Sequence, residues 1–140
     1  MSTAIFYVDD DQDDLDLFKG VADELGHPTA LFNNGNQLLD AVKNPPPKPT
    51  LVFIDLNMPI INGFEVLEQL KELNPENIIP VVVLTTANDL ATVDRCHKLG
   101  ARMFVKKPNS ITELRETLKK VAEIEWDTFP THREAFVFKK

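Results

Sequence analysis

The stretch Leu51-Val-Phe-Ile-Asp-Leu-Asn-Met-Pro59 decides the fold that we predict for this chain. Its first four residues are apolar, and they lead without a break to a single carboxylate, Asp55. A short apolar run rich in Val, Ile and Phe is typical of a strand buried on both faces of a parallel sheet. Ligands of open parallel sheets bind at the carboxyl ends of the strands. Asp55 is therefore expected where a functional site forms.

A second apolar run also ends in carboxylates. Residues Ile5-Phe-Tyr-Val8 are followed by Asp9-Asp10-Asp11, and six of the eight residues from 9 to 16 are aspartate. The start of a helix accounts for Asp13 and Asp14, because a helix N-terminus favours negative charge. A helix start does not account for Asp9 and Asp10, which follow the strand directly. Like charges against a core cost free energy unless a cation or a hydrogen-bond donor is present.

The rest of the chain repeats the same alternation. We expect strands over residues 4–8, 29–32, 51–54, 81–84 and 103–105, each followed by a segment with apolar residues at helical spacing. Five such units predict an α/β fold of the (βα)5 kind, a five-stranded parallel sheet with helices on both faces. The order 2-1-3-4-5 sets the first and third strands side by side, so that Asp9, Asp10 and Asp55 converge at one edge. Thr85 and Lys107 end the fourth and fifth strands and reach the same edge.

Three local features refine this prediction. Gly63 is expected to supply backbone freedom before the helix that starts at Phe64. The segment 88–99 has a thin apolar face that begins with Leu90. The last helix has a capping box, Ser110 with Glu113, and an apolar stripe that begins with Ile111.

Length and composition exclude several classes of protein. The chain has 140 residues, of which 43% are hydrophobic and 26% charged, as in an ordinary globular domain. A formal net charge of −7 argues against nucleic-acid binding. No apolar run approaches the length of a membrane span, and the N-terminus lacks the features of a signal peptide. A single cysteine, Cys96, suits a reducing compartment, and we expect a cytoplasmic protein.

One domain over residues 1–125 is expected, followed by a tail, residues 126–140, that is too short to be a separate domain. Several apolar residues lie in this tail, including Phe129, Phe136 and Phe138. They either dock back on the domain or form a surface for a partner, unless the tail is simply frayed.

Three converging carboxylates call for a hard cation, and Mg²⁺ prefers oxygen ligands of this kind. A carboxylate beside Mg²⁺ can attack a phosphoryl donor and form an aspartyl phosphate. A lysine and a hydroxyl on neighbouring strand ends would complete the set of groups that bind the transferred phosphoryl oxygens.

These residues carry a family resemblance. Val8-Asp9-Asp10, Asp55-Leu56-Asn57-Met58-Pro59 with Asn62-Gly63, Leu84-Thr85 and Lys107-Pro108 together resemble the receiver domain of two-component response regulators, of the single-domain, CheY-like kind. The resemblance extends from about residue 4 to residue 124 and implies the flavodoxin-like fold of CheY.

The resemblance also implies a role for each site residue. Asp55 would be the phosphoacceptor. Asp10 would bind Mg²⁺ directly, Asp9 would act mainly through metal-bound water, and Asn57 would offer its backbone carbonyl. Lys107 would pair with the phosphoryl group.

Two further positions would form a switch. Thr85 would supply the switch hydroxyl, and Phe104 holds the position of the aromatic switch residue, although an ordinary core role for Phe104 stays open. The implied activity is a phosphorelay in which the chain catalyses only its own phosphorylation and dephosphorylation. A histidine kinase or a phosphotransfer protein would be the donor, and a downstream protein, or a second copy in a homodimer, the partner.

Two alternatives stay open. The first is a small Mg²⁺-dependent phosphatase that works through an aspartyl phosphate, although haloacid-dehalogenase-like phosphatases have a second Asp where this chain has Asn57. The second is a degenerate receiver that binds constitutively, and it is disfavoured because every position of the acceptor site is filled.

Overall fold

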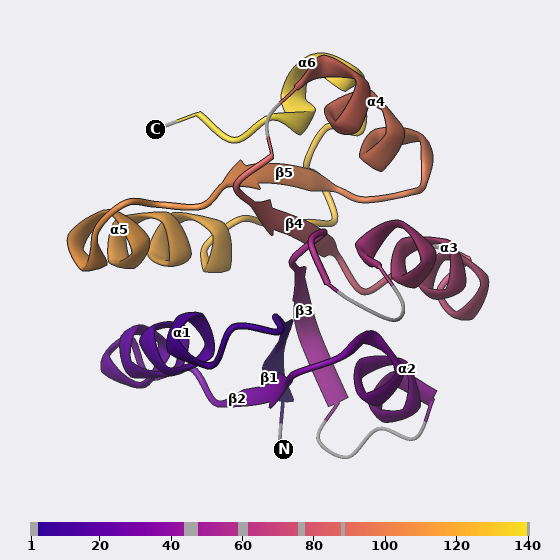
Figure 1. The fold of residues 1–140 in the computed structure, drawn as a ribbon. Coiled ribbons are helices and arrows are strands. Elements are labelled where there is room, and N and C mark those ends of the chain that lie inside the picture. The colour runs from indigo at the N-terminus through magenta and orange to yellow at the C-terminus, as the bar shows by residue number, and fades with distance from the viewer. Residues whose placement is uncertain (1–2, 44–47, 59–61, 76–77, 88, 140) are drawn as a thin grey trace.

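The computed structural model describes residues 3–43, 48–58, 62–75, 78–87 and 89–139, and its strands and helices alternate along the chain (Figure 1). The elements are β1 (Thr3–Val8), α1 (Gln12–Glu24), β2 (Thr29–Phe32), α2 (Gly35–Lys43), β3 (Lys48–Ile54), α3 (Gly63–Leu73), β4 (Val81–Thr85), α4 (Leu90–Lys98), β5 (Met103–Lys106), α5 (Ile111–Ala122) and α6 (Arg133–Phe136). No helix among the described residues combines the length and the apolar character needed to cross a membrane.

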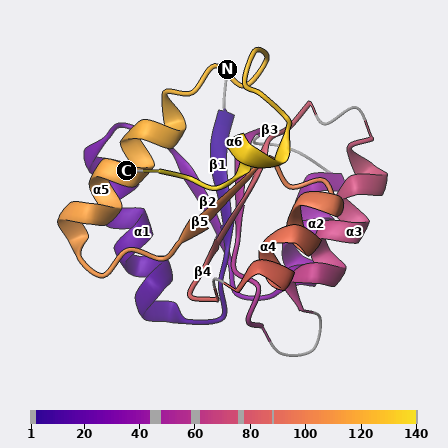
Figure 2. The same cartoon turned by 90° about the horizontal axis from the view of Figure 1, so that it is seen from above.

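The five strands form one parallel sheet in the order β2-β1-β3-β4-β5, so the predicted fold is confirmed. Helices cover both faces: α1 and α5 lie on one side, and α2, α3 and α4 lie on the other (Figure 2). β1 and β3 are neighbours at the centre, with Val8 paired to Ile54. The residues that follow these two strands are therefore adjacent, which brings the aspartates together.

The sheet is buried on both faces because its strands carry apolar residues in both directions. Along β3, Leu51 and Phe53 belong to the core under α1 and α5, whereas Val52 and Ile54 belong to the core under the other three helices. Side chains alternate between the faces of a strand, so an unbroken apolar run fills both cores. This confirms the interpretation of residues 51–54.

The last helix starts at its predicted cap, but the first residues of two predicted apolar stripes are not in the core. The Ser110 hydroxyl accepts a hydrogen bond from the Glu113 backbone N–H, as expected of the N-cap of α5. Leu90 is 74% exposed and Ile111 is 49% exposed. Each is the first residue of its helix, at the carboxyl edge of the sheet, where there is less of the sheet to pack against. Consequently α4 buries only Val93 and Cys96.

Gly63 is needed for a reason other than the one predicted. It is the first residue of α3, and its backbone is not in the positive-φ region. A Cβ atom built at this position would lie 2.5 Å from the Leu56 Cα and 2.9 Å from the Asp55 carbonyl oxygen. The loop after β3 therefore passes too close to α3 for any side chain, and backbone freedom is not the cause.

The C-terminal segment, residues 126–139, docks on the domain. Its short helix α6 lies beside α4 (Figure 1), and Phe136 is buried at 1% exposure. Val137 forms a parallel bridge with Phe104 of β5. Of the alternatives considered for this segment, the structure therefore shows docking.

Candidate functional site

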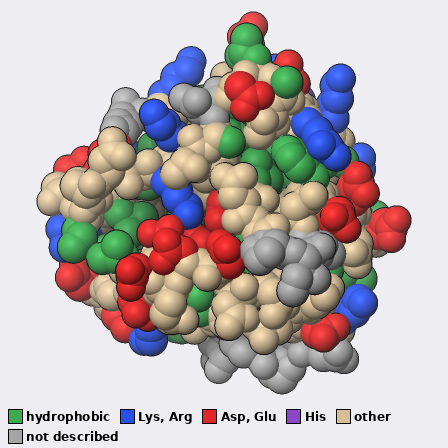
Figure 3. All heavy atoms as spheres, viewed as in Figure 1, with side chains coloured by type: hydrophobic (Ala, Val, Ile, Leu, Met, Phe, Trp, Pro, Cys, Tyr) green, Lys and Arg blue, Asp and Glu red, His purple; other side chains and the backbone are tan. Residues whose placement is uncertain are grey.

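The acidic cluster forms at the carboxyl edge of the sheet, on the face seen in Figure 3. Carboxylate oxygens of Asp9, Asp10 and Asp55 all lie within 4.8 Å of one another. Asp9 and Asp55 are buried, and Asp10 is exposed. The Asp55 backbone N–H donates to the Val8 carbonyl at 3.1 Å, which extends the pairing of β1 with β3 up to the site. The sequence predicted this convergence.

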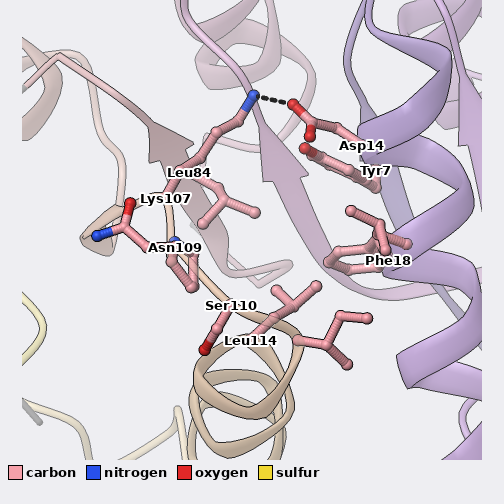
Figure 4. Close-up of a pocket in the computed structure, with 11 residues that line it drawn as sticks. Tyr7, Asp14, Phe18, Leu84, Lys107, Asn109, Ser110 and Leu114 are labelled. Carbon is pink, nitrogen blue, oxygen red and sulfur yellow. Dashed lines mark hydrogen bonds and ion pairs between the residues drawn. The ribbon is translucent and has the colours of Figure 1, made fainter.

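Lys107 reaches the cluster from the end of β5. Its Nζ lies 2.7 Å from Asp9 Oδ2, 2.8 Å from Asp14 Oδ2 and 3.6 Å from Asp55 Oδ2. The pairing with Asp14, drawn as a dashed line in Figure 4, was missed in the sequence, where Asp14 was explained only by the helix start. No spacing rule signals it, because it depends on how α1 packs beside α5, which follows the loop that carries Lys107.

Tyr7 is a second residue that was missed. Its hydroxyl donates a hydrogen bond to Asp9 Oδ2, while the Asp11 backbone N–H donates to Asp9 Oδ1 at 3.0 Å. Side chains two apart on a strand point to the same face, so the spacing of Tyr7 and Asp9 was an available signal. With Lys107, three donors hold the Asp9 carboxylate in one orientation.

The two buried aspartates have opposite pKa shifts. Burial acts to raise the pKa of Asp9, but hydrogen bonds from Lys107 and Tyr7 outweigh it and hold that pKa below its ordinary value. Burial, followed by the charge of Asp9, raises the pKa of Asp55 to about 6, although Lys107 acts in the opposite direction. The negative charge on Asp55 is thus only partly compensated by the protein, and a bound cation would relieve the remaining repulsion.

Thr85 ends β4 on the same edge and is fully buried. Its hydroxyl oxygen has no hydrogen-bond partner among the described residues, although its backbone carbonyl accepts a hydrogen bond from the Lys107 N–H at 2.8 Å. Buried hydroxyl groups are nearly always hydrogen-bonded, so an orphaned one calls for an explanation.

Asn57 and Phe104 occupy different environments. The Asn57 backbone N–H donates to Asp55 Oδ1 at 3.3 Å, and its side chain is exposed. Phe104 is 2% exposed and lies in the core on the α4 side of the sheet, where its ring centroid is 6.3 Å from that of Phe136. The roles predicted for these residues, a carbonyl ligand and a rotating switch, stay predictions.

A cavity of about 530 Å³ opens beside Lys107 between α1 and α5 (Figure 4). Its floor is apolar and includes Phe18, Leu84 and Leu114. Leu17 and Ile111, both large and exposed, also line it. An apolar groove therefore adjoins the polar site.

The fold and the site define an α/β protein with an acidic cluster and a lysine at the carboxyl edge of its parallel sheet, and comparison with known proteins gives the family. The family model described as response regulator receiver domain matches residues 5–119. The chain is 33% identical over 120 residues to sporulation initiation phosphotransferase F of Bacillus subtilis, covering 86% of this chain and 94% of that protein. It is 27% identical over 119 residues to the polar-differentiation response regulator DivK of Brucella anthropi, covering 85% and 95%.

A solved structure supports the fold. The phosphorylated cyanobacterial phytochrome response regulator RcpA superposes with a TM-score of 0.78 at 24% identity, covering 91% of this chain and 96% of that one. The chain belongs to the response regulator receiver domain family. It is a phosphoacceptor in two-component signalling, and the phosphatase alternative is not favoured.

Proposed function

We propose that Asp55 is the residue that accepts the phosphoryl group, in a Mg²⁺-dependent reaction that switches the binding of a partner protein. The observation that carries this proposal is the meeting of Asp9, Asp10, Asp55 and Lys107 at one edge of the sheet. An Asp55 oxygen would attack the phosphorus of a phosphohistidine. The P–O bond would form as the P–N bond to the donor histidine breaks.

Hydrogen bonding favours Asp55 over Asp9 as the nucleophile. Both oxygens of Asp9 accept hydrogen bonds, from Asp11, Tyr7 and Lys107. The contacts of Asp55 with these donors are weaker: the Asn57 backbone N–H donates to it at 3.3 Å, and Lys107 Nζ lies 3.6 Å away. Lone pairs that are already engaged are poor nucleophiles, so Asp55 is the better placed carboxylate.

The donor set fits Mg²⁺. Asp9, Asp10 and Asp55 bring oxygens within 4.8 Å of one another, and the exposure of Asp10 leaves one side open to water. These three residues, with the Asn57 carbonyl, would hold the ion. When bound, Mg²⁺ would neutralise negative charge on the carboxylates and on the phosphoryl oxygens.

The donor would dock in the groove between α1 and α5. A histidine kinase or a phosphotransfer protein must present its phosphohistidine to Asp55, and the groove lies beside Lys107. Exposed Leu17 and Ile111 suit an apolar surface on the donor. The chain itself would catalyse only its own phosphorylation and dephosphorylation.

The unpartnered hydroxyl of Thr85 would respond to phosphorylation. A phosphoryl group on Asp55 would offer this buried hydroxyl a hydrogen-bond acceptor. It would also bring new negative charge with which Lys107 could pair. Movement of Thr85 would then act on β5 and Phe104, and so on the surface that receives the downstream protein or a second copy of the chain.

Incubation with Mg²⁺ and acetyl phosphate, followed by intact-mass measurement, tests the proposal. We expect one phosphoryl adduct on the wild-type chain, no adduct on Asp55→Asn, and little adduct when EDTA replaces Mg²⁺. Asp16→Asn, a change on the exposed side of α1, is the matched control and should label normally. Equal labelling of Asp55→Asn and wild type would show that another residue is the acceptor.

A further inference from the structure

We propose that the C-terminal segment, residues 126–139, is the resident partner of the surface formed by α4 and β5, and that phosphorylation of Asp55 releases it. The second half of this proposal rests on the proposed function of Asp55. The segment lies beyond the matched receiver region, which ends at residue 119, so the family resemblance says nothing about it.

An aromatic anchor holds the segment. The Phe136 side chain is almost completely buried, with its ring centroid 5.0 Å from the His97 ring on α4 and 6.3 Å from the Phe104 ring on β5. Phe136 belongs to the same core cluster as Val93 and Cys96, the two buried residues of α4. The anchor of the segment is therefore also part of what holds α4 on the sheet.

Backbone hydrogen bonding attaches the segment to the free edge of the sheet. β5 is the last strand in the sheet order, and its outer side is open to pairing. The Phe138 N–H donates to the Phe104 carbonyl at 2.9 Å, and Val137 forms the parallel bridge to the same residue. The segment thus satisfies part of an edge that could otherwise pair with another chain.

Polar contacts fix the path of the segment. Arg133 Nε lies 2.7 Å from Asp94 Oδ1, and His97 Nε2 lies 3.0 Å from the Thr131 carbonyl oxygen. The Arg102 guanidinium donates to the carbonyl oxygens of Trp126 and Phe129, each at 3.0 Å. Contacts from α4 and from the residue before β5 therefore hold the segment from Trp126 to Arg133.

The attachment is nevertheless limited, as a reversible contact requires. The helix α6 has four residues, and the pairing with β5 is a single bridge. A groove of about 410 Å³ runs between the segment and α5, lined by Ile124, Phe129 and Phe138 among others. The Arg133–Asp94 ion pair is solvent-exposed, and such pairs contribute little. The segment can therefore leave without unfolding the sheet.

Phe104 links the segment to the phosphoacceptor site. It pairs with Val83 of β4, two residues before Thr85, and β5 leads directly to Lys107. The segment is docked in the arrangement in which Lys107 pairs with Asp9 and the Thr85 hydroxyl is unpartnered. If the contacts of the docked segment are lost when Phe104 moves, they stabilise the observed arrangement and oppose that rearrangement. Release would uncover the β5 edge and α4 for a downstream protein.

Thermodynamic linkage makes the proposal testable with beryllofluoride, a stand-in for the phosphoryl group. If bound beryllofluoride shifts the equilibrium toward release of the segment by some factor, then release of the segment must increase the affinity for beryllofluoride by the same factor. Phe136→Ala removes the anchor, and Phe138→Pro removes the N–H that donates to Phe104. Phe136→Leu keeps an apolar anchor and is the matched control. Far-UV circular dichroism verifies that each variant is folded.

Trp126, the single tryptophan of the chain, reports docking. Its ring lies 5.6 Å from the Arg102 guanidinium, which is outside the segment, so its environment and its fluorescence change when the segment leaves. With Mg²⁺ present, we expect beryllofluoride to increase acrylamide quenching of Trp126 at least twofold in the wild type. Phe136→Ala and Phe138→Pro should show high quenching throughout and bind beryllofluoride at least threefold more tightly, whereas Phe136→Leu should resemble the wild type.

The outcomes separate the two proposals. Beryllofluoride binding that leaves Trp126 quenching unchanged in the wild type would overturn the linkage but not the role of Asp55. The linkage would also be overturned if Phe136→Ala and Phe138→Pro show high quenching but bind beryllofluoride with wild-type affinity. A wild-type chain that binds no beryllofluoride would contradict the proposed function, and it would also contradict release of the segment by phosphorylation. Acrylamide quenching of Trp126 in Phe136→Ala would still show whether Phe136 anchors the segment.

Discussion

Asp9 and Asp55 are the same residue type at the ends of neighbouring strands, yet the protein treats their charges differently. Asp9 receives hydrogen bonds from Tyr7, Lys107 and a backbone N–H, and its pKa is lowered. Asp55 receives less compensation, and burial raises its pKa to about 6. One carboxylate is thus held as a fixed charge, and the other is left with affinity for a cation or an electrophile.

Tyr7→Phe tests the hydrogen bond that fixes Asp9. A hydrogen bond to a charged group contributes about 1.5–3 kcal/mol, and because Lys107 and Asp11 remain as donors we expect a loss of about 1–2 kcal/mol of unfolding free energy at pH 7. Asp9 has a lowered pKa in the folded state, so the stability due to its ionised form is present above its unfolded pKa and is lost as the pH falls through the folded pKa. The penalty of Tyr7→Phe should therefore shrink in acid.

Urea unfolding at pH 7 and at pH 3 measures this effect. The same substitution in an Asp9→Asn background is the control, and its penalty should be smaller at pH 7. A penalty that is independent of pH and of Asp9 would mean that the tyrosine hydroxyl serves the core and not the site.

At the scale of elements, close approach between α3 and the loop after β3 shapes the site. Gly63 begins α3 directly against Leu56, one residue after Asp55. Asn62 caps this helix by accepting a hydrogen bond from the Glu65 N–H at 3.1 Å. The helix α3 thereby packs onto the backbone next to Asp55, so the positions of α3 and Asp55 depend on each other.

Gly63→Ala should destabilise the protein by about 3 kcal/mol, because the new methyl group would overlap backbone atoms that cannot move aside cheaply. Gly20→Ala is the matched control: it lies within α1, and a Cβ there meets no atom within 4 Å. We expect it to stabilise by about 0.5–1 kcal/mol, because alanine has the higher helix propensity. Urea denaturation of both variants measures the difference. A tolerated Gly63→Ala would contradict the close approach.

At the scale of the whole molecule, one sheet has a hydrophobic core on each face, and three carboxylates gather at its carboxyl edge. The net charge of −7 adds to the repulsion at that edge. The helices α4 and α6 are held by few buried side chains, two in α4 and one in α6. The elements able to move are therefore those that adjoin β5.

Mg²⁺ should raise the thermal midpoint of unfolding. A ligand that binds only the folded state stabilises it by about 2.7 kcal/mol at a hundredfold excess over Kd, which for a domain of this size is a shift of several degrees. Asp10→Ala should abolish most of the shift, because it removes an exposed carboxylate of the cluster without disturbing the core. Differential scanning calorimetry with NaCl at equal ionic strength separates specific binding from screening. An equal shift in both proteins would argue against a site at Asp10.

The sequence alone determined the five-unit fold, the strand order and the meeting of Asp9, Asp10 and Asp55, because these follow from local periodicity and from which strands are neighbours. It could not determine the pairing of Asp14 with Lys107, since 93 residues separate them and only the packing of α1 beside α5 brings them together. The reason for Gly63 was likewise decided by a close approach between elements. The sequence left three alternatives for the C-terminal segment. The tertiary structure shows that it docks, because only the assembled sheet offers an open edge for pairing and an apolar site for Phe136.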